Sequence, residues 1–324
     1  MRGEIERSVV VITGASSGIG RATALAFARR GASVALAARR EDPLRALARD
    51  CESEGGRALA VPADVTDADA VEELARRATE AFGHLDTWVN NAGVTLFSRF
   101  DEAPPDLFRR VVETNFFGYV HGARAALARF REQGSGVLVN NASLNARVPA
   151  PYVSAYVAAK WAIRGWSESL RQELRDAGEI HVCTLLPASI DTPFFQHAAN
   201  FTGRGVKPLN PLNAPEKVAD AIVGLAERPR REILVGRGAR LLSLQHALAP
   251  ALAERAFAAQ VERDHFRDER AAPTAGNLLE PVPAGTEASG GWRDGRRSRR
   301  LVLAAGTALV PALAAGAWLR SAKS

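Results

Sequence analysis

The chain alternates short apolar runs with longer stretches whose apolar positions recur at helical spacing. The short runs predict seven strands, at residues 9–13, 33–37, 57–62, 87–90, 136–141, 180–186 and 232–235. The stretches between them predict helices at residues 21–30, 43–54, 67–82, 104–131, 153–176 and 215–227. Because strands and helices alternate, the pattern predicts a parallel sheet with helices on both faces, spanning residues 1–238.

The pattern changes after Gly238. Leucines at 241, 244, 248 and 252 keep helical spacing around Pro250 and predict a helical extension over residues 239–270. Packing on the domain and a role as a lid or at a membrane surface both fit this amphipathic pattern. Residues 271–300 are rich in Pro, Gly, Ala and Ser and end in arginines, which predicts a flexible basic linker.

A charge-free segment, Leu301–Leu319, follows the linker. Nineteen helical residues span about 28 Å, close to the thickness of a bilayer core. We therefore predict a transmembrane helix at residues 301–319, with an amphipathic or buried helix as the alternative. Five arginines in residues 293–300 precede it and two basic residues follow it, so the positive-inside rule leaves the large domain in the cytoplasm.

Composition narrows the function classes. The net charge is +6, but residues 271–324 hold seven Lys and Arg against three acidic residues, which leaves +2 for the rest. The excess charge lies in the tail and not on a basic face, so we expect no nucleic-acid binding. Only Cys51 and Cys183 are present, far apart and without ligand spacing, which predicts neither disulfides nor a metal site and fits a reducing compartment. The N-terminus lacks an apolar run, so no signal peptide is expected.

A glycine-rich turn, Thr13–Gly20, joins the first expected strand to the first helix. Glycines at 14, 18 and 20 allow a tight turn and the close approach of a pyrophosphate, and the helix N-terminus beyond them favours anions. The turn predicts a dinucleotide site. We expect Gly14, Ser16, Ser17, Gly18, Ile19 and Gly20 to form it.

The end of the second strand often selects between the two nicotinamide dinucleotides. An acidic residue there would bind the ribose 2′-hydroxyl of NAD, but this strand ends in Arg39 and Arg40. Two guanidiniums suit a 2′-phosphate, which favours NADP(H) over NAD(H); solvated arginines that open a helix are the alternative. Asp64 and Val65, after the third strand, are expected at the adenine edge.

Tyr156 and Lys160 are four residues apart in an expected helix and thus share one face. A nearby ammonium favours phenolate over phenol, so the pair predicts a lowered pKa for Tyr156 and proton exchange with an alcohol or ketone. Two unrelated residues on a helix are the alternative, because this spacing alone is common.

With these motifs the chain resembles the short-chain dehydrogenases/reductases in their compact single-domain subtype, over residues 6–236. The resemblance rests on Thr-Gly-x-x-x-Gly-x-Gly at 13–20, Asn-Asn-Ala-Gly at 90–93 and Tyr-x-x-x-Lys at 156–160. It implies a doubly wound α/β Rossmann fold with a seven-stranded parallel sheet.

The resemblance also implies roles. Tyr156 would be the general acid or base, Lys160 would bind the nicotinamide ribose and lower the tyrosine pKa, and Ser143 would hydrogen-bond the substrate carbonyl. Asn115 would hold a water that links Lys160 to solvent. Asn90, Asn91, Ala92 and Gly93 would steady the sheet and line the cofactor site, and Pro187, Ile190 and Thr192 would meet the nicotinamide. Ala188 stands where the family usually has glycine, with little effect expected.

Residues 192–213 are expected to form a flap over the substrate. Its apolar side chains, together with the predicted membrane anchor, suggest an apolar, lipid-like carbonyl or alcohol. The flap residues in question are Phe194, Phe195, Phe201, Val206 and Leu209, stiffened by Pro208 and Pro211. A small soluble carbonyl is the alternative.

Two other functions remain open. A 3-oxoacyl thioester reductase would need a basic rim for acidic acyl carrier protein, for which Arg147, Arg204 and Lys207 are candidates. A membrane-tethered NADP(H)-binding protein without turnover would not need the residues that resemble the catalytic set. The resemblance further suggests a homodimer or homotetramer, formed through the helices at 104–131 and 153–176.

Overall fold

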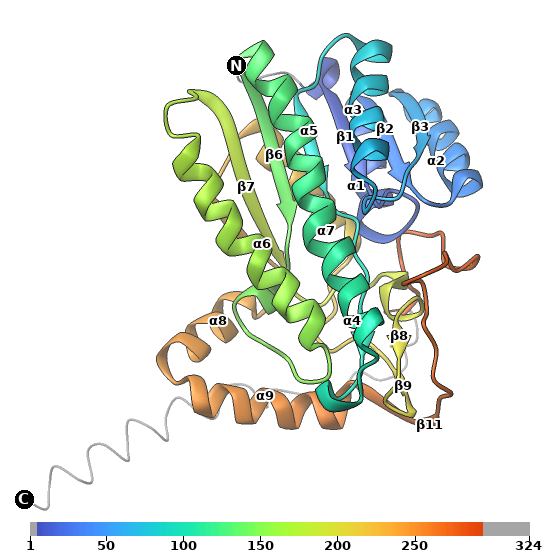
Figure 1. Ribbon diagram of the computed structural model, residues 1–324, viewed down its shortest axis with the longest axis vertical. Coiled ribbons are helices and arrows are strands. Elements are labelled where there is room, and N and C mark those ends of the chain that lie inside the picture. Colours follow the sequence, from blue (N-terminus) through green and yellow to red (C-terminus); the bar gives the residue numbers. More distant parts are fainter. Residues whose placement is uncertain (1–4, 294–324) are drawn as a thin grey trace, which may run out of the picture. The chain divides into compact units, whose positions relative to one another are not determined.

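The computed structural model describes residues 5–293 and is built around a seven-stranded parallel sheet (Figure 1). The strand order is β10-β7-β6-β4-β1-β2-β3. The strands are β1 Val9–Thr13, β2 Ser33–Ala38, β3 Arg57–Pro62, β4 Thr87–Asn90, β6 Ser135–Asn141, β7 Glu179–Pro187 and β10 Glu232–Val235. The predicted doubly wound sheet is confirmed, with strand ends within a residue or so of those expected.

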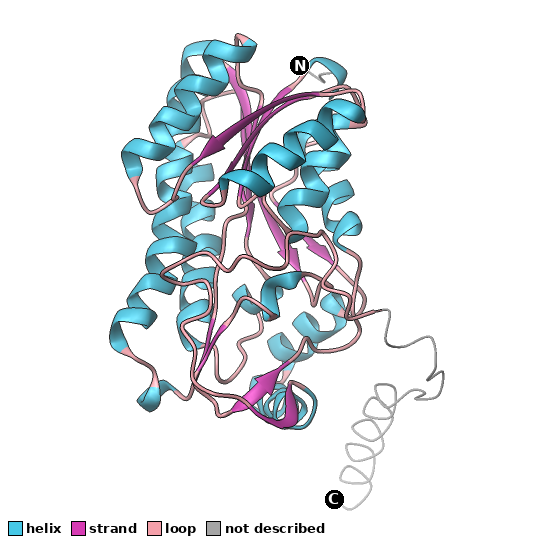
Figure 2. Cartoon of the chain, turned by 90° about the vertical axis from the view of Figure 1, so that its right-hand side faces the viewer, coloured by secondary structure: helices cyan, strands magenta, loops and turns pink. Residues whose placement is uncertain are grey.

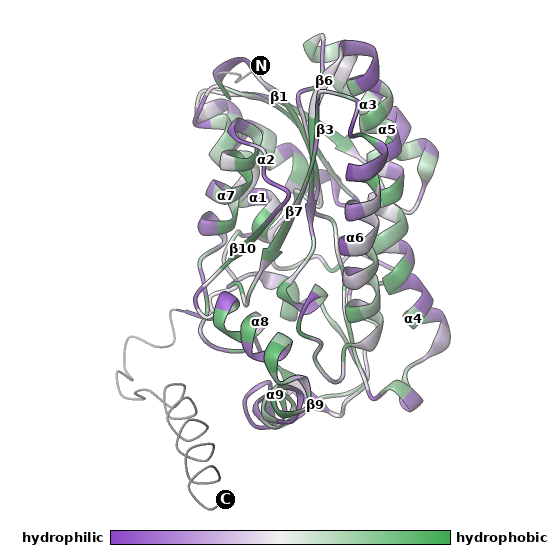
Figure 3. Cartoon of the chain, turned by 90° about the vertical axis from the view of Figure 1, so that its left-hand side faces the viewer, coloured by the Kyte–Doolittle hydropathy of each residue, from purple (hydrophilic) through white to green (hydrophobic). Residues whose placement is uncertain are grey.

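Helices cover both faces of the sheet. The helices are α1 Gly18–Ala28, α2 Glu41–Ser53, α3 Ala68–Phe82, α4 Pro105–Val112, α5 Gly118–Gln133, α6 Ser154–Glu173 and α7 Pro215–Glu227. Side chains alternate along a strand, so Val10 and Ile12 of β1 pack in the core with α1, α2 and α7. Val9 and Val11 pack in the opposite core with α3, α5 and α6. The central strands are therefore apolar on both sides, and hydrophobic residues colour much of the sheet green in Figure 3.

Two small sheets attach the loop after β7 to the rest of the chain. β5 Leu96–Phe97 pairs with β8 Ala199–Asn200, and β9 Arg204–Val206 pairs with β11 Phe266–Arg270. The predicted flap is thus held to the body at two places.

The extension after the sheet is only partly helical. α8 Ala239–Leu248 and α9 Pro250–Asp264 form an α-hairpin-like pair, because Pro250 opens a new helix where it needs no N–H donor. The chain then becomes the strand β11, which differs from the predicted helix to residue 270. Leu241, Leu244, Leu248 and Leu252 are all more than half exposed.

The segment predicted to be a flexible linker instead packs along the body as far as Trp292 (Figures 1 and 2). Its backbone carbonyl oxygens accept hydrogen bonds from two arginines and one glycine amide of the sheet domain. These contacts hold the segment on the domain, and its amino-acid composition does not indicate them. Within residues 5–293 the structure has no helix long and apolar enough to cross a membrane. The predicted transmembrane helix at 301–319, and the linker beyond 293, lie outside the described residues.

Candidate active site

A cavity of about 490 Å³ lies at the carboxyl ends of the sheet strands, where α/β folds bind their ligands. The turn after β1 and the ends of β2, β3, β4 and β6 form its nucleotide-side walls. Helix α6 and the loop after β7 close the other side. The connections of the sheet therefore bring the predicted residues to one place, although the first and last of them, Gly14 and Thr192, are 178 positions apart in the sequence.

Almost every predicted site residue lines this cavity. These residues are Gly14, Ser16, Ser17, Gly18, Ile19, Arg39, Arg40, Asp64, Val65, Asn91, Ala92, Gly93, Ser143, Tyr156, Lys160, Pro187, Ile190 and Thr192. Gly20 and Asn115 lie behind the wall. Asn90 is also behind it, fully buried, where it accepts a hydrogen bond from the Trp88 indole and donates to Asn140.

The glycine-rich turn has the close contacts that require glycine. Gly14 has φ +64°, and a Cβ there would lie 2.7 Å from the Ala92 Cα. A Cβ on Gly20 would lie 2.2 Å from the Gly14 carbonyl oxygen. Gly20 thus shapes the turn from behind without facing the cavity. The resulting cradle, with the α1 N-terminus at its floor, fits the pyrophosphate of a dinucleotide.

Arg39 and Arg40 stand side by side at the end of β2. Burial lowers the pKa of both guanidiniums. At Arg40 the positive charge of Arg39 lowers the pKa further. The neighbouring carboxylate, Asp64, is bound 2.6 Å from Arg110 instead. Burial alone would raise the pKa of Asp64, but hydrogen bonds from Thr66 and the charge of Arg110 hold it below its ordinary value. Within residues 5–293 neither arginine forms an ion pair with a carboxylate, so a phosphate group could be accommodated beside them.

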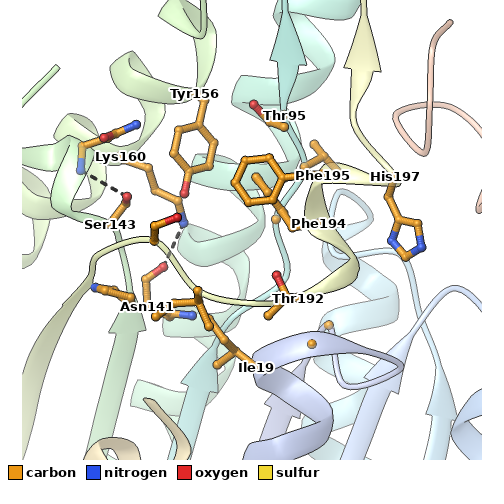
Figure 4. A pocket seen from close by; sticks show the side chains of 18 of the residues that line it. Ile19, Thr95, Asn141, Ser143, Tyr156, Lys160, Thr192, Phe194, Phe195 and His197 are labelled. Carbon is orange, nitrogen blue, oxygen red and sulfur yellow. Dashed lines mark hydrogen bonds between the residues drawn. The ribbon is translucent and has the colours of Figure 1, made fainter. Parts of the chain in front are cut away.

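Tyr156 and Lys160 lie on one face of α6, and their side chains converge in the cavity (Figure 4). The Lys160 ammonium is 5.5 Å from the centre of the Tyr156 ring and donates to the Asn141 carbonyl oxygen at 2.8 Å. It also donates to the Tyr119 hydroxyl at 3.3 Å. The predicted juxtaposition of phenol and ammonium is therefore present, held by acceptors from β6 and α5.

The predicted lowering of the Tyr156 pKa is not what the structure shows. Burial raises the pKa of Tyr156 to about 12, and the Ser143 hydroxyl, which hydrogen-bonds it, acts in the opposite direction. Burial likewise lowers the pKa of Lys160 to about 7. Low-polarity surroundings disfavour both charged forms, and this effect exceeds the attraction between ammonium and phenolate.

Ser143 lies two residues after the end of β6 and caps the short helix η4 Leu144–Ala146. Its backbone is extended, and its hydroxyl oxygen accepts a hydrogen bond from the Asn145 amide at 3.1 Å. This cap fixes the hydroxyl on the cavity wall beside Tyr156.

Asn115 lies in a π-helical turn, Glu113–Phe117, that separates α4 from α5. Its side chain is fully buried and makes two hydrogen bonds with the Val94 backbone, at 2.8 and 2.9 Å. The side chain therefore braces the loop after β4, and the predicted link from Asn115 to Lys160 through water stays a prediction.

Several cavity residues were not predicted. Asn141 on the cavity wall and Tyr119 buried behind it both accept hydrogen bonds from Lys160. Asn141 does so through its backbone oxygen, for which the sequence gives no signal. The far wall includes Phe257 and Gln260 of α9 and His265, all beyond the part of the chain that carries the motifs. Of the predicted flap side chains, Phe194, Phe195 and Leu209 line the cavity. Phe201 and Val206 pack in neighbouring apolar clusters.

Comparison with known proteins places this site in a family. The model of the short chain dehydrogenase family matches residues 8–202. The uncharacterized oxidoreductase YxnA of Bacillus subtilis (strain 168) is 38% identical over 255 residues, 78% of this chain and 72% of that protein. The chain belongs to the short-chain dehydrogenase family. This short-chain dehydrogenase is accordingly an NAD(P)-dependent oxidoreductase, as the resemblance implied.

Solved structures of similar proteins carry both kinds of cofactor. An alcohol dehydrogenase from the archaeon Thermococcus sibiricus, complexed with 5-hydroxy-NADP, is 32% identical with a TM-score of 0.62, covering 70% of this chain and 95% of its own. A short chain dehydrogenase/reductase from Burkholderia phymatum, in complex with NAD, is 27% identical with a TM-score of 0.71, covering 77% and 96%. A nicotinamide dinucleotide is thus supported for the fold, and the choice between NADP and NAD falls to the residues of this chain.

Proposed function

We propose that this short-chain dehydrogenase uses NADP(H) to interconvert a carbonyl and a secondary alcohol on an apolar substrate, with Tyr156 as the proton donor and acceptor. The observation that carries the proposal is a single cavity whose wall holds the glycine cradle, the Arg39–Arg40 pair, and Ser143, Tyr156 and Lys160. Binding, polarising and proton-transferring groups therefore face the same space.

The cradle at residues 14–19 would hold the pyrophosphate, and Arg39 with Arg40 would hold the 2′-phosphate. Asp64 and Val65 would flank the adenine, and Ile190 and Thr192 the nicotinamide end. When bound, the nicotinamide supplies the hydride for reduction or accepts it in oxidation.

In the reducing direction Tyr156 holds the proton that the substrate oxygen needs. Its raised pKa keeps the hydroxyl protonated at neutral pH. The Ser143 hydroxyl beside it would hydrogen-bond the substrate oxygen and stabilise the negative charge that develops on that oxygen. Lys160, with a pKa near 7, is poised to return a proton to Tyr156 at neutral pH. Its contacts with Asn141 and Tyr119 keep the ammonium against the ring of Tyr156.

The substrate end of the cavity is apolar. Phe194 packs edge-on against Tyr156 with ring centres 5.7 Å apart, and Phe195 continues the aromatic wall toward His265. Figure 4 shows Phe194 and Phe195 on the side of Tyr156 that faces away from Ser143. An apolar carbonyl compound suits this wall better than a charged metabolite.

The alternative of a 3-oxoacyl thioester reductase is less well supported. Two of the three candidate rim cations are already paired: Arg147 with Glu232, and Arg204 with Glu262. They offer little free positive charge to an acidic carrier protein. A non-catalytic NADP(H)-binding role would leave the polar set at Ser143, Tyr156 and Lys160 without a purpose.

Substitution of Tyr156 by phenylalanine separates catalysis from binding. Tyr156→Phe keeps the ring and removes the hydroxyl that exchanges the proton, so we expect kcat to fall by about 10² to 10⁴ while calorimetry still detects NADPH binding. Tyr152→Phe is the matched control, because that hydroxyl bonds Glu262 outside the cavity. Full activity of Tyr156→Phe would overturn the catalytic role, and absence of NADPH binding to the unsubstituted protein would overturn the cofactor assignment.

A further inference from the structure

Residues 274–292, which we name the strap, run along the cofactor side of the cavity after β11 (Figure 1). They are anchored at both ends to the loop after β7. Thr274 exchanges backbone hydrogen bonds with Asn200, and Trp292 donates from its backbone to Asp191 and from its indole to the Thr192 carbonyl oxygen. Between these anchors Leu278 is fully buried in the apolar cluster of α4 and β5. The strap is thus a docked part of the domain.

Backbone carbonyl oxygens of the strap accept hydrogen bonds from Arg39 and Arg40. Arg39 donates to the carbonyl oxygens of Asn277, Leu278 and Leu279, the last at 3.2 Å. Arg40 donates to those of Val282 and Ala284 at 2.9 and 3.0 Å, with longer contacts to Pro283 and Gly285. Both terminal nitrogens of each guanidinium therefore have strap acceptors.

The charges of the two arginines are not balanced by these contacts. In the described part of the chain neither Arg39 nor Arg40 forms an ion pair, and Asp64 is bound to Arg110. Carbonyl oxygens are neutral acceptors, whereas hydrogen bonds to an ionised acceptor are about twice as strong. A phosphate would therefore bind Arg39 and Arg40 more strongly than the strap carbonyls do.

We propose that the strap sets the selectivity between NADPH and NADH, because its carbonyls at residues 277–285 compete with the 2′-phosphate for Arg39 and Arg40. The proposal rests on the cofactor site described above. NADPH must displace these carbonyls to engage the arginines, whereas NADH, with a 2′-hydroxyl, leaves them in place. The docked strap consequently weakens NADPH relative to NADH. By reciprocity, NADPH loosens the strap more than NADH does.

A contact common to both cofactors does not enter this comparison. The Gly18 amide at the start of α1 donates to the Glu287 carbonyl oxygen at 2.9 Å. Any cofactor that needs this amide displaces the same bond, so its cost cancels in the ratio of the two dissociation constants. The ratio isolates the contacts of Arg39 and Arg40.

Two glycines of the strap provide a matched pair of variants. Gly276 has φ +53°, and a Cβ there would lie 2.3 Å from the His197 carbonyl oxygen, so Gly276→Ala undocks the strap. Gly291 has φ +72°, but no atom of residues 5–293 lies within 4 Å of such a Cβ. Gly291→Ala therefore carries similar backbone strain without the clash.

Calorimetric titration of the full-length variants with NADPH and with NADH tests the proposal. We expect Gly276→Ala to raise the ratio of the NADH to the NADPH dissociation constant about tenfold, equivalent to ~1.4 kcal/mol. Gly291→Ala should match the unsubstituted protein. An unchanged or lower ratio in Gly276→Ala would overturn the proposal, and thermal unfolding verifies that both variants keep the folded core.

Hydrogen exchange on the unsubstituted protein gives an answer that needs no variant. Amides of residues 277–285 should exchange faster with NADPH bound than with NADH bound. Slower exchange with NADPH would mean that the strap closes over the cofactor, which contradicts competition. If neither dinucleotide binds at all, the proposed function fails; if both bind and the ratio and exchange are insensitive to the strap, only this inference fails.

Discussion

Lys160 shows how burial governs the chemistry of single residues in this site. It is 3% exposed, and among the described residues its ammonium contacts a carbonyl oxygen, a hydroxyl and two aromatic rings. None of these carries a full negative charge, so desolvation determines its pKa of about 7. The sequence spacing predicts that Tyr156 and Lys160 meet, but the direction of the pKa shift at Tyr156 depends on enclosure, which spacing does not describe.

The pKa of Lys160 has a consequence for stability. The ordinary pKa of the group is 10.5 and the folded value about 7, so between these pH values the unfolded chain binds more protons. Stability must therefore rise with pH in this window, by up to about 1.4 kcal/mol per pH unit from this residue. Relative to Lys160→Met, the unsubstituted protein should gain free energy of unfolding from about pH 7 to pH 9 in urea titrations.

The exposed Lys217 of α7 provides the control for this titration. Lys217→Met should show the same pH dependence of unfolding as the unsubstituted protein. If the difference between the unsubstituted protein and Lys160→Met stays constant with pH, Lys160 does not lose its proton through burial.

At the scale of elements, the sequence predicts what periodicity encodes and misses what depends on contacts. All seven strands and six helical stretches of the main domain follow from apolar spacing, although the stretch predicted as one helix at residues 104–131 forms two, α4 and α5. The cofactor residues follow from the turns that join these elements. The π-helical turn around Asn115 interrupts a stretch whose sequence predicts one continuous helix. The sequence does not indicate this turn, because Asn115 there makes tertiary hydrogen bonds to the Val94 backbone. The strap is missed for a similar reason, since its docking uses backbone carbonyls and arginines more than 230 residues away.

The packing of α5 on β4 gives a prediction that sequence propensity alone would get wrong. Gly122 touches the sheet so closely that a Cβ would lie 2.2 Å from Asn90 Oδ1 and 2.6 Å from the Trp88 indole nitrogen. Alanine normally favours a helix by about 0.5–1 kcal/mol over glycine, but here it disrupts a buried hydrogen-bond network. We expect Gly122→Ala to lower the free energy of unfolding by about 1–3 kcal/mol.

Gly165 in α6 is the matched position. It is exposed, and a Cβ there would meet no atom within 4 Å. Gly165→Ala should therefore stabilise the protein by about 0.5–1 kcal/mol. Chemical denaturation of both variants checks the opposite signs; a stabilised Gly122→Ala protein would show that α5 can move away from the sheet at no cost.

At the scale of the whole molecule, two regions of the chain build the cavity. Residues 8–202, which match the family model, supply the cofactor cradle and the reacting groups. The chain beyond them supplies the substrate wall at Phe257, Gln260 and His265, and the strap beside the arginines. Family membership therefore accounts for the chemistry. The chain beyond residue 202 adds to the two features that would set selectivity, the aromatic wall at Phe194 and Phe195 and the Arg39–Arg40 pair.

A series of apolar ketones of increasing chain length tests this division. Each buried methylene contributes about 0.8 kcal/mol, close to fourfold in kcat/KM, until the cavity is filled. Phe257→Ala removes an apolar wall residue of α9, so it should flatten this gain for long ketones and leave short ones nearly unchanged. Leu248→Ala is the control, because that side chain is 77% exposed.

If kcat/KM does not rise with chain length in the unsubstituted protein, the apolar wall packs against the sheet without contacting substrate. An equal loss for all lengths in Phe257→Ala would instead assign α9 to the framework of the cavity.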